Sequence, residues 1–124
     1  MYTPTTDTLL LIEIEDLLCW MGATPGTRSF AQTVWAVALF MEDPEQMRFN
    51  TKILYPDVAK KFHTNSAAVE RNVRVVLNQI WRNTPEKVSE IVGRDLPRRP
   101  KPREFLTILH NYLARRHPKF GSLS

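Results

Sequence analysis

Apolar side chains recur at helical spacing along the chain, and this periodicity constrains the fold more than any other feature. The clearest example is SAAVERNVRVVLNQIWR, residues 66–82. Five of its apolar residues fall within roughly 100° of arc on a helical wheel, the mark of a helix with one buried face. Alternation of the strand type is weak throughout. The sequence therefore predicts an all-α fold, and the buried stripe of this segment is Val69, Val73, Val76, Leu77 and Ile80.

Capping residues, glycines and prolines divide the chain into about six helices. The first is expected to begin near Asp7 and to end before Gly22, and Ser29 is expected to cap a second, nearly all-apolar helix. Another helical turn is expected near Met47. A length of 124 residues fits one compact domain, residues 1–124. A short helix is predicted at residues 56–62, starting at Pro56, and a long one at residues 66–82, capped by Asn65 or Ser66. A further helix is predicted at residues 85–92 and ends before Gly93. The last helix is predicted at residues 102–116, and its inward residues are Phe105, Leu106, Leu109 and Leu113.

Charge is distributed unevenly along the chain. Residues 1–51 hold two Lys or Arg against seven Asp or Glu, a net charge of −5. Residues 52–124 hold fifteen against six, a net charge of +9. Such polarity indicates a polyanionic partner for the second part, although a solvated basic face gives the same composition.

Residues 55–82 have the pattern of a helix-turn-helix, with the break at HTNS. The major groove of DNA is about 12 Å wide and admits one helix. Ala67 and Ala68, at the start of the second helix, would let its backbone come close. Two amphipathic helices with a short turn are common in other proteins, so a merely solvated helix face is the competing interpretation.

The candidate DNA-binding residues follow from this placement. Arg71 and Arg74 match the two acceptors on a guanine edge, and Glu70 matches a cytosine amino group. Contacts to the DNA backbone are expected from Lys60 and Lys61. The basic linker residues form either a phosphate-contacting arm or a soluble linker. The other candidates for the DNA backbone are Thr64, Asn65, Ser66, Asn78, Arg98, Arg99 and Lys101.

Other kinds of site have little support. No phosphate loop, nucleophile elbow or carboxylate pair is present, so an enzyme and a bound cofactor are not predicted. The histidines lack cysteine partners at metal-ligand spacing, and no apolar run is long enough for a membrane span. The single cysteine excludes an internal disulfide and favours a cytoplasmic setting. Cys19 is expected to be buried, and so are the three tryptophans, Trp20, Trp35 and Trp81. The histidines without metal partners are His63, His110 and His117.

The strings KILYPDVAKKF and VERNVR, with Trp81 after them, resemble the C-terminal effector domain of the stage-zero sporulation response regulator. The resemblance runs without gaps from about Gly22 to Trp81 and continues more weakly through KPREF. It implies a six-helix domain that regulates transcription in spore-forming Firmicutes. It also implies binding to a duplex box reading about T-G-T-C-G-A-A, as a homodimer on tandem copies. By position, Glu70 and Arg71 correspond to base-reading residues.

Departures from that family pattern keep an alternative open. The chain begins with its own methionine and has no room for a receiver domain, and Val75 replaces a polar residue near the groove side. Residues 84–96 resemble the segment that the family uses to touch the polymerase sigma subunit, but here the sequence diverges. A helical protein-interaction module that sequesters a sigma factor or another regulator is therefore the alternative to a DNA-binding regulator.

Overall fold

The computed structural model describes residues 4–43 and 51–116, and these residues form six helices and no strand. The predicted all-α class is confirmed. The segment near Met47, where a further helical turn was expected, and His117 lie outside the described residues. The helices are α1 Pro4–Trp20, α2 Arg28–Glu42, α4 Thr51–Lys61, α5 Ser66–Asn83, α6 Pro85–Val92 and α7 Pro102–Arg116.

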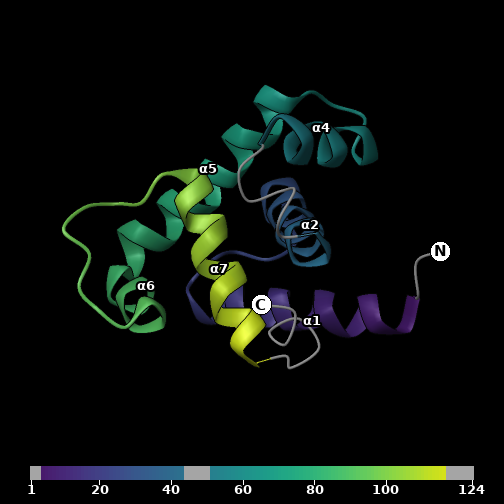
Figure 1. Cartoon of the computed structure of the whole chain (residues 1–124). Helices are drawn as coiled ribbons and strands as arrows, with labels where there is room; N and C mark the ends of the chain where they lie inside the picture. The colour runs from purple at the N-terminus through teal and green to yellow at the C-terminus, as the bar shows by residue number, and fades with distance from the viewer. Residues whose placement is uncertain (1–3, 44–50, 117–124) are drawn as a thin grey trace.

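Helix α2 is the centre of the structure, as its nearly uniform apolar sequence predicts. It packs against α1, α4, α5 and α7. Figure 1 shows α1 crossing below α2, α4 above it, and α7 passing in front of α5. Phe40 on α2 and Phe105 on α7 are fully buried in the shared core. Each buried side chain of this size contributes about 1.5–3 kcal/mol to folding, so one central helix fixes the positions of four others.

The predicted buried stripe of α5 is confirmed. All five of its residues are at most 2 % exposed and belong to the hydrophobic core, where α5 packs against α2, α4, α6 and α7. The inward residues predicted for α7 are confirmed as well, with exposures of 1 % or less. The opposite side of α5 is consequently turned to solvent.

Several helix ends lie where the sequence places them. Asn65 adopts the extended N-cap conformation, and its side chain accepts a hydrogen bond from the Ala68 amide at 2.8 Å. Gly22 and Gly93 follow α1 and α6 with φ of +104° and +90°, values at which glycine is favoured. The capping rules therefore predict these three boundaries correctly.

Three predicted helix starts are wrong. Helix α1 begins at Pro4, three residues before Asp7, because proline fits the first helical position. The N-cap of α2 is Thr27, whose hydroxyl accepts from the Phe30 amide at 3.0 Å, whereas Ser29 lies inside the helix. Helix α4 begins at Thr51, so Pro56 lies within it.

The extension of α4 has a packing reason. Leu54 and Tyr55 precede Pro56 and are 1 % and 6 % exposed. A proline inside a helix removes one backbone hydrogen bond. Burial of two large side chains offsets that loss, so the helix starts a full turn earlier than its proline suggests.

The burial expected at the end of α1 is also wrong. Cys19 is exposed and Trp20 is 41 % exposed. Trp20 instead packs under Lys87, whose ammonium lies 4.7 Å from the ring centroid and donates to the Trp20 carbonyl at 2.7 Å. Trp35 and Trp81 are half-buried against the core. None of the described helices is long and apolar enough to cross a membrane.

Candidate nucleic-acid interface

A four-residue turn, residues 62–65, joins α4 to α5. The Thr64 amide donates to the Ala59 carbonyl at 2.9 Å, and the His63 amide donates to the Lys60 carbonyl at 3.4 Å. This pair of bonds is a Schellman motif, with His63 at the left-handed position at φ of +56°. The turn is tight because it satisfies the last carbonyls of α4 and the first amides of α5 together.

A cation on α2 supports the same turn. Arg28 donates from Nη2 to the Phe62 carbonyl at 2.7 Å, and its guanidinium lies 5.9 Å from the centroid of the Phe62 ring. Arg28 was not among the residues predicted from the sequence to form the interface. Its signal was available, because Arg28 is one of only two Lys or Arg in residues 1–51.

The rotation of α5 about its axis is set by a polar chain at the α2–α5 contact. Ser29 donates to Asn72 Oδ1 at 3.0 Å, and Asn72 Nδ2 donates to Gln32 Oε1 at 2.7 Å. Gln32 is fully buried, and its Nε2 has no hydrogen-bond partner among the described residues. Directional bonds of this kind fix which side of α5 faces outward. These bonds were not predicted from the sequence, although a glutamine within an apolar helix indicates that a polar partner is needed.

The outward side of α5 carries the predicted base-reading residues. Arg71 is exposed and forms no hydrogen bond or ion pair with the described part of the chain. Ala67 is exposed one turn before it, while Ala68, expected to share this entrance, is buried at 9 % exposure. The close approach predicted for two alanines is therefore open to Ala67 alone.

Glu70 and Arg74 form an ion pair one turn apart on α5, with Arg74 Nη2 3.2 Å from Glu70 Oε1. Their side chains are 47 % and 42 % exposed. An exposed pair of this type is worth only about 0.3–0.5 kcal/mol. Both groups therefore remain available to a partner at a small cost.

The two lysines at the end of α4 differ from each other. Lys60 is exposed and unpaired within the described residues, whereas the Lys61 ammonium lies 4.1 Å from the centroid of the Trp35 ring. A cation over an aromatic face gains about 0.5–1 kcal/mol at an exposed site. Lys61 thus ties α4 to α2, and Lys60 is the freer cation.

The turn places the other small polar candidates together at the start of α5. The carbonyl oxygen of the Asn65 side chain is occupied by the capping bond, and Thr64 and Ser66 are half-exposed. Asn65 is therefore a structural cap, and the amide nitrogen of its exposed side chain can still donate a hydrogen bond to a partner.

The linker between α6 and α7 reaches back to α5. Arg99 donates from Nη1 to Asn78 Oδ1, which joins two of the predicted backbone-contacting residues. Arg98 and Lys101 are exposed on either side of this contact. The structure thus brings the basic linker alongside the outward face of α5, a proximity that the sequence did not predict.

Tyr55 lies beneath this charged surface. Burial, and secondarily the negative charge of Glu70, raise the pKa of its hydroxyl to about 12, while Arg74 and Arg103 act in the opposite direction. The hydroxyl is buried and has no hydrogen-bond partner among the described residues. The neutral phenol is consequently the form that the folded state prefers.

This preference predicts a pH-dependent effect of Tyr55→Phe. Between pH 10 and 12 the unfolded tyrosine loses its proton while the folded one keeps it, so the parent loses stability as the pH rises. Phenylalanine does not ionise, so the variant does not lose stability in this way, and it also lacks the unpaired buried hydroxyl. We expect its free energy of unfolding, measured by urea denaturation, to equal or exceed that of the parent at pH 7. The difference in its favour is expected to grow above pH 10. A difference that stays constant from pH 8 to 11.5 would contradict this.

Metal ligands are not gathered at this surface. Within the described residues no group of three or more His, Cys, Asp or Glu side chains is placed to hold a metal ion. His110 packs against Phe40 in the core, with ring centroids 4.7 Å apart, and its Nδ1 lies 3.0 Å from Asn111 Oδ1.

A small all-helical domain that turns one cationic helix face outward has the features of a DNA-binding regulatory domain. Comparison with known families supports this class: the family described as sporulation initiation factor Spo0A C terminal matches residues 14–113. The chain therefore belongs to the family of Spo0A C-terminal effector domains. These are DNA-binding domains of transcription regulators and are not enzymes.

Proposed function

We propose that this protein binds duplex DNA in a sequence-specific manner, with α4, its turn and α5 acting as a helix-turn-helix. Helix α5, predicted as the recognition helix over residues 66–82, enters the major groove. Arg71 and Arg74 donate to guanine edges, and Glu70 accepts from a cytosine amino group. The observation that carries the proposal is Arg71, an exposed guanidinium without an internal partner on the outward face of a helix whose rotation is fixed.

In this proposal, residues near both ends of α5 contact the DNA backbone. Lys60 and the turn residues Thr64, Asn65 and Ser66 lie at one end. Asn78, with Arg99 bonded to it, lies toward the other end, next to Arg98 and Lys101. Phosphate contacts on both flanks fix the register of a helix in the groove. Lys61 contributes more weakly because it is held over Trp35.

The family supports further proposals on partners. The chain acts in the cytoplasm, pairs as a homodimer on tandem boxes, and contacts the polymerase sigma subunit through residues 84–96, which include α6.

A single observation favours the alternative, a module that sequesters a sigma factor or another regulator. Val75 is 48 % exposed near Arg71 on α5, and an exposed apolar side chain suits a protein surface, although it also suits a thymine methyl group.

A fluorescence anisotropy titration at two salt concentrations tests the proposal. The probes are a duplex carrying the T-G-T-C-G-A-A box and a duplex with the same bases scrambled. We expect binding to the box to be at least about tenfold tighter, and affinity for both duplexes to fall with salt because phosphate contacts release counterions. Equal affinity for the two duplexes, or no binding at low salt, would favour the protein-interaction module.

A further inference from the structure

Val75 is an exposed apolar side chain on the outward side of α5. It is 48 % exposed, and among the described residues the other exposed large apolar side chains all lie on α1. A β-branched residue at an exposed helix position favours the helix less than alanine or a long polar residue does. Val75 contributes little to the core from this position, so neither packing nor helix formation accounts for a valine there.

The place of Val75 on α5 is between two groups of proposed DNA contacts. Arg71 precedes it by four residues, so the two share one face and are about 6 Å apart along the helix axis. Asn78 follows it by three residues and accepts a hydrogen bond from Arg99. Successive base pairs are about 3.4 Å apart. With α5 along the major groove, Val75 therefore lies one or two base pairs from the guanine that Arg71 contacts.

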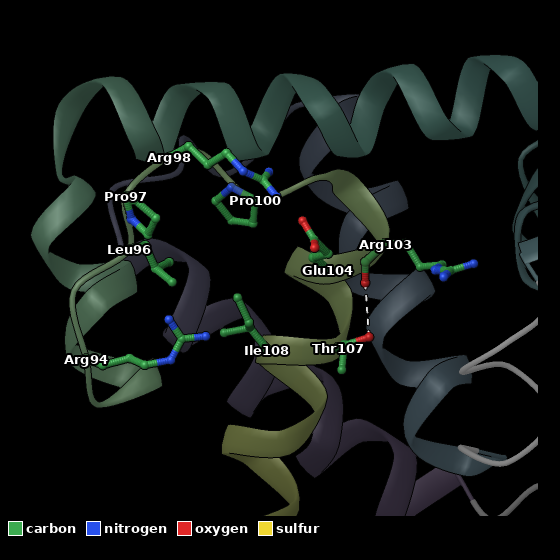
Figure 2. Close-up of a pocket in the computed structure, with 9 residues that line it drawn as sticks. All are labelled: Arg94, Leu96, Pro97, Arg98, Pro100, Arg103, Glu104, Thr107 and Ile108. Carbon is green, nitrogen blue, oxygen red and sulfur yellow. Dashed lines mark hydrogen bonds between the residues drawn. The ribbon is translucent and has the colours of Figure 1, made fainter.

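The linker between α6 and α7 leaves Val75 open to a partner. Arg94 and Arg98 reach from the linker into a groove of about 550 Å³ that lies against α7 (Figure 2), and Val75 does not line this groove. A valine side chain is short, so only a surface close to the backbone of α5 can contact it. Ala67 is exposed on the same face, two turns before Val75, and permits such an approach.

We infer that Val75 packs against the 5-methyl group of a thymine, one or two base pairs from the guanine that Arg71 contacts. This contact rests on the proposed function and adds a base preference to it. Thymine presents a methyl group in the major groove, and apolar side chains recognise it by contact. Cytosine presents an amino donor there, which valine cannot accept and which would lose its water. Val75 therefore favours thymine over cytosine at this position.

Deoxyuridine in place of thymine tests this contact, because it removes the methyl group and keeps every hydrogen-bonding group of the base. The probes are the T-G-T-C-G-A-A box duplex and the same duplex with deoxyuridine at every thymine of the box on both strands. We expect the parent to bind the uracil duplex about fourfold more weakly, the effect of one buried methyl group. Val75→Ala lacks the contact and is expected to bind both duplexes equally, about fourfold more weakly than the parent binds the thymine duplex. Fluorescence anisotropy measures the four affinities, and single deoxyuridine substitutions locate the thymine.

Arg82→Ala is the control variant. Arg82 lies seven residues beyond Val75, in the last turn of α5, so this variant is expected to keep the fourfold sensitivity to deoxyuridine. Alanine favours a helix and Val75 is exposed, so far-UV circular dichroism of Val75→Ala is expected to match the parent. Equal binding of the parent to the box and scrambled duplexes would refute the proposed function, and the thymine contact with it. A parent that prefers the box but does not sense deoxyuridine, or that senses it no more than Val75→Ala does, would overturn the thymine contact alone.

Discussion

Replacing Arg71 with alanine is expected to weaken binding to the box duplex by about 1–3 kcal/mol, which is about fivefold to more than a hundredfold in affinity. The guanidinium is exposed and has no internal partner among the described residues, so its removal leaves the fold intact. Binding to the scrambled duplex is expected to change far less, because only a contact to base edges distinguishes the two sequences. Fluorescence anisotropy with both duplexes measures the two changes.

Arg82→Ala is the matched control for this prediction. Arg82 is exposed in the last turn of the same helix, so the variant loses the same charge about three turns from Arg71. We expect it to lower the affinity for both duplexes equally and slightly, and to reduce the salt dependence. If Arg71→Ala behaved like Arg82→Ala, then Arg71 would be a phosphate contact at most, and the proposed orientation of α5 in the groove would be wrong.

Glu70 and Arg74 differ from Arg71 because they form an ion pair with each other in the free protein. A contact from Arg74 to a base requires the 3.2 Å pair to open, at a cost of about 0.3–0.5 kcal/mol. That cost is small beside the about 1–3 kcal/mol that a good base contact contributes. The pair therefore holds both side chains over the face of α5 in the free protein without preventing either from engaging DNA.

The sequence predicted the parts of the fold that depend on local chemistry. The buried stripe of α5, the Asn65 cap, the glycines after α1 and α6, and the bounds of α7 all follow from helical spacing and backbone preference. Each is decided within a few residues of chain. The start of α4 was missed because tertiary burial of Leu54 and Tyr55 overrides the local signal of Pro56.

The outward position of the candidate residues could be predicted from the sequence, but the contacts that hold this side of α5 in place could not. Arg71, Arg74 and Glu70 are visible as the outward side of an amphipathic helix. The contacts that hold this side in place join positions far apart in sequence, as between Asn72 and Gln32, Arg28 and Phe62, and Arg99 and Asn78. A side chain that serves a distant partner gives no periodic signal, so only the folded structure reveals it.

Gly22→Ala is expected to cost about 2–4 kcal/mol of the free energy of unfolding, for two reasons that can be separated. The φ of +104° is unfavourable for any residue with a Cβ. A Cβ at this position would also lie 3.0 Å from the Thr84 hydroxyl oxygen. That hydroxyl donates to the carbonyl of Met21 and lies 3.3 Å from that of Ile80, so it joins the end of α1 to the end of α5 and resists displacement.

Gly26→Ala isolates the first reason, because its φ is +82° and an added Cβ meets no atom within 4 Å. We expect it to cost only about 1 kcal/mol, since the strain is partly offset by the lower entropy of the unfolded chain. Thr84→Ala removes the atom that the new Cβ would strike, so Gly22→Ala should cost less in that background than in the parent, and the difference is the coupling energy. Urea denaturation of the four proteins of this cycle, together with Gly26→Ala, measures each quantity. Equal costs at Gly22 and Gly26, with no coupling to Thr84, would mean that the ends of α1 and α5 are not held together by this contact.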